Sequence, residues 1–491
     1  MKIGIDFGTS FSMPAVVVNG APRTLLPNGE YAIPSVFYYD TEVGVQIGKA
    51  AEDNADFQPL NVKRDIKMEL STNCAAFVAD GMTFSAKQII NYIFEEIRKV
   101  SLNESKRREL VSQKIDGAVI SVPVAFTLRE LNLIREAAES PNSDGKDVLN
   151  VLGFIREPVA AAISYFNAPN SEDNKTILVY DLGGGTCDVA IVRSSKNASE
   201  WYTVIDSDMD RIGGREWDKA LIKLIKQKYQ EKTGHLDFDA EMENKILKQA
   251  INVKHILSDQ RVARASVTLS GKTYSCVITV EEFERATANI LQSTMQLVNK
   301  LIEKCNVPID YIVCVGGSSN MPQIRKNFES SYPEIPVKLY EPEKAIAYGA
   351  AIYAEHLTEK NFLSDICKFS YGALYLDSLS RYQGKKREII NNIIYKGTQL
   401  PASSESTSYH IRSGRYTIEL PIYESEKTER IYLPTEGTHI GDILIECSEN
   451  SKESDATLLK MAIDPNGLMT LNAIEVRTGD QVTAEIRLND F

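Results

Sequence analysis

The chain has 491 residues, too many for one hydrophobic core, and this length predicts two or three domains. Hydrophobic residues make up 43% and charged residues 25%, which is typical of globular proteins and argues against a disordered or fibrous chain. The formal net charge is -12 and no basic run interrupts it, so nucleic acid is a poor candidate partner, because phosphate backbones require clustered Lys and Arg.

The sequence also indicates the cellular compartment of the protein and argues against some kinds of structural and metal site. It opens with a strand-like run rather than a signal peptide, and it has no apolar stretch long enough to span a membrane. Seven cysteines without a CxxC pair argue against a disulfide framework, and five scattered histidines argue against a metal site built on His or Cys. We therefore expect a cytoplasmic protein with no membrane partner.

The first predicted element is a β-hairpin whose first strand ends in an aspartate. Strand-like runs occupy Lys2–Ile5 and Ala15–Val18, and the turn between them begins Asp6-Phe-Gly-Thr-Ser10. Glycine in such a turn lets backbone N–H groups approach an anion, and a carboxylate at its edge can hold Mg²⁺ through water. One such loop is weak evidence for a phosphate site.

Strands and helices alternate up to about residue 357. Two helices, Ala86–Val100 and Thr287–Lys304, are predicted from apolar residues at helical spacing, and we interpret their faces as core-facing surfaces without chemistry. The residues on these faces are Ile90, Ile93, Ile97 and Val100 in the first helix, and Ile290, Thr294, Leu297 and Leu301 in the second.

The sequence motif of the first hairpin occurs again in the middle of the chain. Strand-like residues occupy Ile177–Tyr180 and Val189–Val192, and Asp181-Leu-Gly-Gly-Gly-Thr186 stands between them. Two copies in one chain suggest a two-lobed fold in which duplicated hairpins hold the phosphates of one nucleotide from opposite sides.

A third glycine signal follows the apolar run Tyr311–Val315. Gly316 and Gly317 lead into Ser318 and a helix start at Pro322, which places backbone N–H groups and a helix N-terminus against a phosphate or ribose. Alone, this pattern is more often a tight turn than a binding loop. The two hairpins in the same chain favour the binding loop.

From about Asp365 the segments become short and β-like. Turns are predicted at residues 464–467 and 478–480, and the alternation over Val482–Leu488 predicts a half-buried final strand. The last 120 or so residues are therefore predicted to be a β-sandwich with polar connections such as Pro401–Ser408. The domain boundary is predicted near His356–Ile366.

Taken together, these motifs resemble the actin-like ATPase fold and, within it, the seventy-kilodalton heat-shock chaperone family of DnaK type. They occur in the family's order and approximate spacing, and the resemblance covers nearly the whole chain. The matching segments are Gly4–Ser10, Ser121–Phe126, Arg156–Tyr165, Asp181–Asp188, Ile212–Asp218, Val315–Ser318, Glu341–Ala351 and, in the β region, Ile463–Leu468 and Ile474–Gly479.

The resemblance implies an ATP-dependent chaperone that uses ATP or ADP with Mg²⁺ held through water. It implies an α/β actin-like ATPase domain at residues 1–357, a linker at 358–367 and a β-sandwich at 368–491 that binds peptide. As a departure from full-length members of the family, no helical lid is expected after the sandwich. The implied partners are unfolded or extended polypeptide, a J-domain co-chaperone and a nucleotide-exchange factor.

The resemblance also assigns a role to each matched position. Asp6 and Asp181 hold hydrated Mg²⁺, and Lys63 places positive charge on the transferred phosphoryl group. By themselves, Lys63 would be read as a solvated surface lysine, and Glu157 and Asp188 as caps or surface carboxylates. The catalytic positions are Lys63, Glu157, Asp181, Thr186 and Asp188. The nucleotide-binding positions are Gly8, Thr9, Ser10, Gly183, Gly184, Gly185, Gly213, Gly214, Lys254, His255, Ser258, Gly316, Gly317, Ser318, Asn320 and Glu343.

The sequence departs from the family pattern around the base and the linker. His255 and Asn320 stand where the family has two arginines that flank adenine, and Ile251 stands where it has a glutamate. Each lost guanidinium contact is worth about 0.5–2 kcal/mol, so adenine recognition is expected to be looser than in the family. Ser364 interrupts the apolar linker, so coupling between the domains is expected to be weak.

Two other functions remain as alternatives. The first is an actin-like ATPase scaffold or regulator with a fixed β docking domain and no chaperone cycle. The second is a sugar kinase of the same fold, against which the β-sandwich and the lack of a recognisable sugar loop argue. ATP turnover with and without unfolded polypeptide separates the chaperone from the scaffold.

Overall fold

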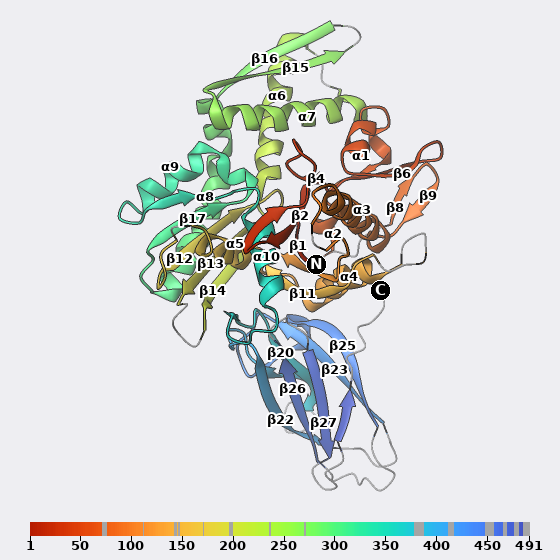
Figure 1. Cartoon of the computed structure of the whole chain (residues 1–491), viewed down its shortest axis with the longest axis vertical. Coiled ribbons are helices and arrows are strands. Elements are labelled where there is room, and N and C mark those ends of the chain that lie inside the picture. The colour runs from red at the N-terminus through yellow and green to blue at the C-terminus, as the bar shows by residue number, and fades with distance from the viewer. Residues whose placement is uncertain are drawn as a thin grey trace. The chain divides into compact units, whose positions relative to one another are not determined.

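The chain folds into an α/β unit, Met1–Phe126 with Glu130–Phe362, and a β unit, Thr127–Arg129 with Leu363–Phe491 (Figure 1). The computed structural model describes residues 1–70, 76–110, 112–141, 145, 148–169, 171–195, 200–234, 237–269, 272–377, 387–410, 417–446, 456–464, 469–475 and 481–484.

Two sheets of the same construction form the frame of the α/β unit. In each, an antiparallel hairpin has its first strand paired on the other side with a parallel strand, which pairs in turn with another parallel strand. The first sheet includes, in order, β11 (Val151–Arg156), β10 (Gly117–Val122), β1 (Lys2–Phe7), β2 (Phe11–Val18) and β3 (Ala21–Thr24). The second includes, in order, β18 (Val337–Leu339), β17 (Tyr311–Val315), β12 (Thr176–Leu182), β13 (Cys187–Ser194) and β14 (Tyr202–Asp210). Both predicted hairpins, β1–β2 and β12–β13, are confirmed.

Helix α10 (Ala345–His356) packs against α5 (Glu157–Phe166) and against β1. The contact between the helices depends on Gly349, because a Cβ atom there would lie 1.7 Å from the carbonyl oxygen of Ala160. Glycine permits two backbones to approach this closely. The start of α5 is thereby held next to the first sheet.

The two predicted helices are confirmed, and both extend beyond the predicted ranges. In α3 (Ala86–Arg107), Ile90, Ile93 and Ile97 are buried, and in α8 (Val280–Cys305), Thr294 and Leu301 are buried. Both helices begin with a capping box, which satisfies N–H groups that the helix itself leaves without partners.

The remaining elements before residue 362 comprise small helices, hairpins and the helices of the second half. They are β4 (Ile33–Pro34), β5 (Phe37–Asp40), β6 (Gly44–Ile47), α1 (Lys49–Asn54), η1 (Pro59–Asn61), β7 (Val62–Lys63), α2 (Ile66–Glu69), β8 (Phe77–Ala79), β9 (Met82–Phe84), α4 (Leu128–Glu139), α6 (Gly214–Thr233), α7 (Ala240–Asp259), β15 (Val262–Leu269), β16 (Lys272–Thr279), η2 (Gly317–Asn320) and α9 (Pro322–Ser331). None of the described helices combines the length and the apolar character that crossing a membrane requires.

The β unit has two antiparallel sheets that share one apolar core. Ile422 and Ile443 of one sheet and Leu459 and Leu471 of the other are buried in this core. The first sheet has, in order, β24 (Ile431–Tyr432), β21 (Arg387–Ile394), β20 (Ser370–Asp377), β23 (Thr417–Ser425) and β25 (Thr438–Glu446). The second has, in order, β22 (Ala402–His410), β26 (Ala456–Ile463), β27 (Met469–Glu475) and β28 (Gln481–Ala484). The remaining elements are β19 (Leu363–Ser364) and η3 (Pro434–Glu436).

One prediction for this unit is wrong. The predicted polar connection Pro401–Ser408 forms most of β22, which pairs with β26 along its length. Ala402 is buried, and the Ser406 hydroxyl lies 2.8 Å from the Tyr375 hydroxyl, so small polar residues take the inward positions of a strand. Their polarity hid the two-residue alternation by which a strand is recognised.

Other predictions fall partly outside the described residues. Outside the described residues lie the predicted turn at 478–480, most of the predicted turn at 464–467, and the part of the predicted final strand beyond Ala484. Five cysteines can be assessed, and all five are free, as expected. They are Cys187, Cys276, Cys305, Cys314 and Cys367.

Candidate functional site

The turns of the two hairpins face each other at very short range. A methyl group on Gly184 would lie 2.4 Å from the Ser10 hydroxyl oxygen, and one on Gly185 would lie 2.9 Å from the Thr9 hydroxyl oxygen. A side chain at either glycine would therefore displace the Ser10 or Thr9 side chain of the first turn. The structure brings together the segments that the sequence predicted to hold phosphates from opposite sides.

The second hairpin turn is also bound to the start of α6. The backbone N–H groups of Gly214 and Arg215 donate to the carbonyl oxygens of Gly183 and Gly184, each at 2.9 Å. Gly213 precedes them, and a Cβ atom there would lie 2.5 Å from the Gly185 nitrogen. The helix N-terminus and the loop therefore form one continuous backbone surface.

The third glycine signal joins the same surface, as the sequence predicted. The Ser318 hydroxyl donates to the Gly183 carbonyl oxygen at 3.0 Å. Gly316 has φ of 82°, and a Cβ atom there would lie 2.5 Å from Oδ1 of Asp181. Gly317, in contrast, is exposed and has open space beside it.

Four carboxylates collect beneath these loops from different elements. Asp6 lies near the end of β1, Glu157 begins α5, and Asp181 and Asp188 are paired across the β12–β13 hairpin. Asp181, Asp188 and Glu157 are almost fully buried. Few hydrogen bonds satisfy the three aspartates: Ser121 donates to Asp6 at 3.1 Å and the Val124 N–H donates to Asp188 at 2.7 Å.

Burial, together with neighbouring negative charge, shifts the protonation of the three aspartates. Burial, and after it the charge of Glu157, raises the pKa of both Asp6 and Asp188 to about 7. Burial raises the pKa of Asp181 well above its ordinary value, with Glu157, Asp188 and Asp6 adding to the effect. The three aspartates therefore keep their protons to higher pH than ordinary aspartates do.

The donor set fits a hydrated Mg²⁺ ion. Oδ1 of Asp181 and Oδ2 of Asp188 are buried oxygens for which the structure has no hydrogen-bond partner, and such oxygens are costly unless a cation or water meets them. In the part of the chain that the structure describes, no three His, Cys, Asp or Glu side chains converge closely enough to ligate a metal directly. Carboxylates that hold Mg²⁺ through water need no such convergence.

A lysine that the sequence analysis did not select lies among these carboxylates. Lys67 of α2 is 2% exposed, and its ammonium group donates to Oε1 of Glu157 at 2.5 Å and to the Phe7 carbonyl oxygen. Lys63 is instead on β7, where it pairs with Glu69 at 2.5 Å. The sequence does contain one indication that Lys67 is buried, because apolar residues, Ile66 and Met68, flank it on both sides.

Other predicted residues are closely bound to the loops. Thr186 accepts the Gly183 N–H on its carbonyl oxygen at 3.0 Å. The Gly8 carbonyl accepts the Ser35 hydroxyl at 2.9 Å, and a Cβ atom on Gly8 would lie 2.2 Å from the carbonyl oxygen of Phe11. These contacts hold each turn in its conformation.

The predicted base-binding residues lie on α7 and nearby. Lys254 pairs with Asp218 of α6 at 2.8 Å and approaches the Gly214 carbonyl oxygen at 3.3 Å, so it adjoins the phosphate loops. His255 is exposed, and partial loss of solvent followed by the charge of Lys254 lowers its pKa, which favours a neutral ring. Glu343 acts on His255 in the opposite direction, so the two side chains lie within electrostatic range.

Two of these residues make local contacts instead. The Ser258 hydroxyl donates to the Lys254 carbonyl oxygen within α7 at 3.1 Å, and the Asn320 amide donates to the Gly317 carbonyl oxygen at 3.0 Å. Neither the Ser258 hydrogen bond nor the Asn320 hydrogen bond involves His255. The base end is therefore a set of separate side chains.

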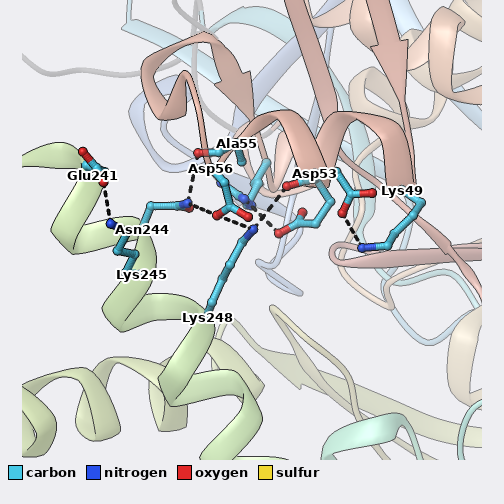
Figure 2. A network of polar contacts seen from close by, with 10 residues as sticks. Lys49, Asp53, Ala55, Asp56, Glu241, Asn244, Lys245 and Lys248 are labelled. Carbon is cyan, nitrogen blue, oxygen red and sulfur yellow. Dashed lines mark hydrogen bonds and ion pairs between the residues drawn. The ribbon is translucent and has the colours of Figure 1, made fainter. Parts of the chain in front are cut away.

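The helix that carries the base residues also contacts α1 and the residues that directly follow it (Figure 2): Lys248 approaches the Glu52 carbonyl oxygen of α1 at 3.4 Å. The Asn244 amide donates to the Ala55 carbonyl oxygen at 3.0 Å and to Asp56 at 3.3 Å, and Lys248 pairs with Asp56 at 2.7 Å. Lys245, one turn from Glu241, pairs within α7 and does not cross to α1. The position of α7 is thus tied to the half of the unit that contains the first sheet.

Comparison with known proteins gives a consistent result. The family model described as Hsp70 protein matches residues 2–490. A ribosome-associated molecular chaperone of Eremothecium gossypii is 28% identical over 99% of this chain and 82% of the relative. A ribosome-associated molecular chaperone of Saccharomyces cerevisiae is 26% identical over 97% and 80%, and the chaperone protein HscA of Buchnera aphidicola is 26% identical over 100% and 96%.

Proposed function

The chain belongs to the Hsp70 family of ATP-dependent chaperones, and from this premise we propose that its α/β unit binds Mg²⁺ with ATP and hydrolyses the nucleotide slowly. The β unit would hold an extended peptide. The observation that carries the proposal is the meeting of two phosphate-type hairpins above buried carboxylates whose oxygens lack partners.

In the proposed site the loops hold phosphates through backbone N–H groups. The turns Gly8–Ser10 and Gly183–Thr186 approach from two sides, and the first N–H groups of α6 hold the second turn by donating to its carbonyl oxygens. Ser318 and Gly213 fix the second turn from outside. We assign the remaining nucleotide contacts to Lys254, His255, Ser258, Asn320, Glu343, Gly214, Gly316 and Gly317.

The four carboxylates have two proposed roles, which are to bind Mg²⁺ and to orient the attacking water. Asp6 and Asp181 would hold the hydrated Mg²⁺, which supplies positive charge to the phosphate oxygens when it is bound. Asp188 and Glu157 would orient the water that attacks the last phosphate, since both are buried and close to the turns. Lys63 by its motif and Lys67 by its burial are the candidates for a fixed positive charge beside the transferred group.

We further propose the domain boundaries 1–357 for the ATPase, 358–367 for the linker and 368–491 for peptide binding. An antiparallel sandwich can hold an extended peptide through backbone hydrogen bonds and small apolar pockets. Unfolded polypeptide, a J-domain co-chaperone and a nucleotide-exchange factor are the partners that this function requires. The cytoplasm is the proposed compartment, in keeping with relatives named as ribosome-associated chaperones.

The test is ATP turnover measured with and without an unfolded polypeptide, in Mg²⁺ and after its removal by EDTA. We expect slow, Mg²⁺-dependent turnover that the polypeptide stimulates. Turnover that is Mg²⁺-dependent but indifferent to polypeptide would support the alternative of a scaffold ATPase. Absence of nucleotide binding would contradict the proposal for the α/β unit altogether.

A further inference from the structure

The two phosphate turns are anchored in two different apolar cores of the α/β unit. Phe7, just before the first turn, lies in one core together with Ile66 of α2. Leu182, just before the glycines of the second turn, lies in the other core together with Trp217 of α6. A contact between α2 and the start of α6 therefore joins the two halves of the unit at the phosphate end.

One ion pair makes such a contact. Oδ2 of Asp65, the residue before α2, lies 3.0 Å from Nη2 of Arg215, the second residue of α6. The side chains are 24% and 34% exposed, so the pair is partly shielded from water and its attraction is less screened than that of a fully exposed pair. Burial raises the pKa of Asp65, and of the charges around it Arg215 opposes this rise most strongly.

The backbone at Asp65 is unusual for the start of a helix. Its φ of 61° and ψ of 25° are left-handed, a conformation that aspartate adopts more readily than most residues. Aspartate in this place commonly caps the helix with its side chain, but the Asp65 carboxylate makes no such hydrogen bond. The carboxylate is directed to α6 instead of its own helix.

Arg215 and the residues after Asp65 both contact the second phosphate turn. The Arg215 N–H donates to the Gly184 carbonyl oxygen at 2.9 Å. On the α2 side, a Cβ atom on Gly185 would lie 2.6 Å from the sulfur of Met68. The α2 segment, Asp65–Glu69, therefore lies against the second turn, and the ion pair joins this segment to the helix that holds the turn.

We infer that the Asp65–Arg215 ion pair holds the α2 segment against the second phosphate turn and thereby slows the release of nucleotide. The first turn and α2 belong to one half of the unit, and the second turn and α6 belong to the other. The halves can move apart at the phosphate end only when the pair breaks. Asp65 and Arg215 are thus positioning residues that act through the turn. The inference rests on the proposed nucleotide site.

The test is a double-mutant cycle with Asp65→Asn, Arg215→Met and the double variant. Asparagine keeps the shape of aspartate and its tolerance of the left-handed backbone. Lys219→Met is the matched control, because Lys219 pairs with Glu216 at 2.9 Å within α6 and does not reach α2. Stopped-flow release of a fluorescent ADP analogue is measured in about 0.05 M and about 0.5 M NaCl, which span weak and strong screening. Hydrogen exchange of the amides of residues 183–186 is measured without nucleotide.

We expect each single variant to release ADP about fivefold faster than the wild type at low salt. The double variant should be no faster than the faster single variant, because either change alone already removes the pair. At high salt the difference from the wild type should fall below about twofold, since salt screens the pair in the wild type. Lys219→Met should match the wild type. Without nucleotide, the amides of residues 183–186 should exchange faster in all three variants of the cycle.

Several outcomes contradict the inference. Effects that multiply in the double variant would show that the two residues act independently, and an acceleration that salt does not change would indicate packing instead of charge. If Arg215→Met does not fold, Asp65→Asn must still accelerate release while Arg215→Lys stays within about twofold of the wild type, and any other result contradicts the inference.

Failure of the inference and failure of the proposed function give different results. A wild type that binds nucleotide, with equal release rates in all variants, overturns the inference alone. A wild type that binds no nucleotide overturns the proposed function. Hydrogen exchange then decides whether the pair holds the turn, and unchanged exchange in Asp65→Asn contradicts it.

Discussion

The phosphate end and the base end of the candidate site are built in different ways. At the phosphate end, Gly213 has no room for a methyl group beside the Gly184 and Gly185 backbone, and Gly184 and Gly185 lie against side chains of the neighbouring segments. At the base end, side chains such as Lys254 and His255 project from one helix and make separate contacts. Backbone contacts constrain several segments at once, whereas a side chain on a helix surface can change alone. This difference explains how the base end can depart from the family while the phosphate end keeps its motifs.

The largest effect should come from a side chain placed between the phosphate segments. In Gly213→Ala, the new Cβ atom would collide with the Gly185 backbone, separate α6 from the second turn and disrupt two hydrogen bonds. We expect about 2–3 kcal/mol lower unfolding free energy and at least 100-fold weaker ADP binding. Denaturant unfolding and calorimetry measure these quantities.

Gly183→Ala provides the control for stability. Its Cβ atom would lie 3.7 Å from the Thr186 carbonyl oxygen, an ordinary contact. The unfolding free energy should change by less than about 0.5 kcal/mol. Equal destabilisation by the two variants would show that close backbone packing does not distinguish the phosphate end.

A smaller effect, confined to chemistry, should follow from Asp188→Asn. The amide oxygen can still accept the Val124 N–H, but the charge at the buried, unpartnered Oδ2 position is lost. We expect about 100-fold slower hydrolysis, with ADP affinity within about threefold of the wild type. Single-turnover kinetics test this. Asp206→Asn, on the neighbouring strand and paired with Lys304, should leave hydrolysis unchanged.

The contact between α7 and α1 tests whether the base end depends on its connection to the other half of the unit (Figure 2). Lys248→Met removes the ion pair with Asp56 and should accelerate ADP release about fivefold, corresponding to about 1 kcal/mol. Lys245→Met removes an ion pair within α7 and should have no effect. Stopped-flow release of a fluorescent ADP analogue distinguishes the two, and equal rates would contradict a role for the α1 contact.

The smallest effect is expected at the base itself. His255→Arg adds a guanidinium plane, and we expect ATP affinity to rise about threefold relative to GTP, corresponding to about 0.7 kcal/mol. Calorimetry with both nucleotides on the wild type and the variant measures the change. If the wild type already binds ATP tightly and the arginine adds nothing, then the exposed base end contains a compensating contact.

The position of Lys67 shows where sequence reasoning reached its limit. A motif identifies a position along the chain, and it selected Lys63. The neighbours of a lysine depend on the path of the chain in space, and Lys67 meets Glu157, which is 90 residues away. The strand β22 was missed for a similar reason, since the inward role of its serines depends on Tyr375 of the other sheet.

By itself, the sequence determined both phosphate hairpins, the glycine turn after Val315, the two long helices and the family of the protein. Each of these depends on local preferences: strand runs broken by glycine, apolar residues at helical spacing, and motifs in a fixed order. The tertiary structure alone decided which loops touch, which carboxylate oxygens lack partners, which lysine is buried among the carboxylates, and that α7 contacts α1 and the residues after it. These features depend on contacts between residues far apart in the chain, and such contacts leave no periodic signal in the residues that make them.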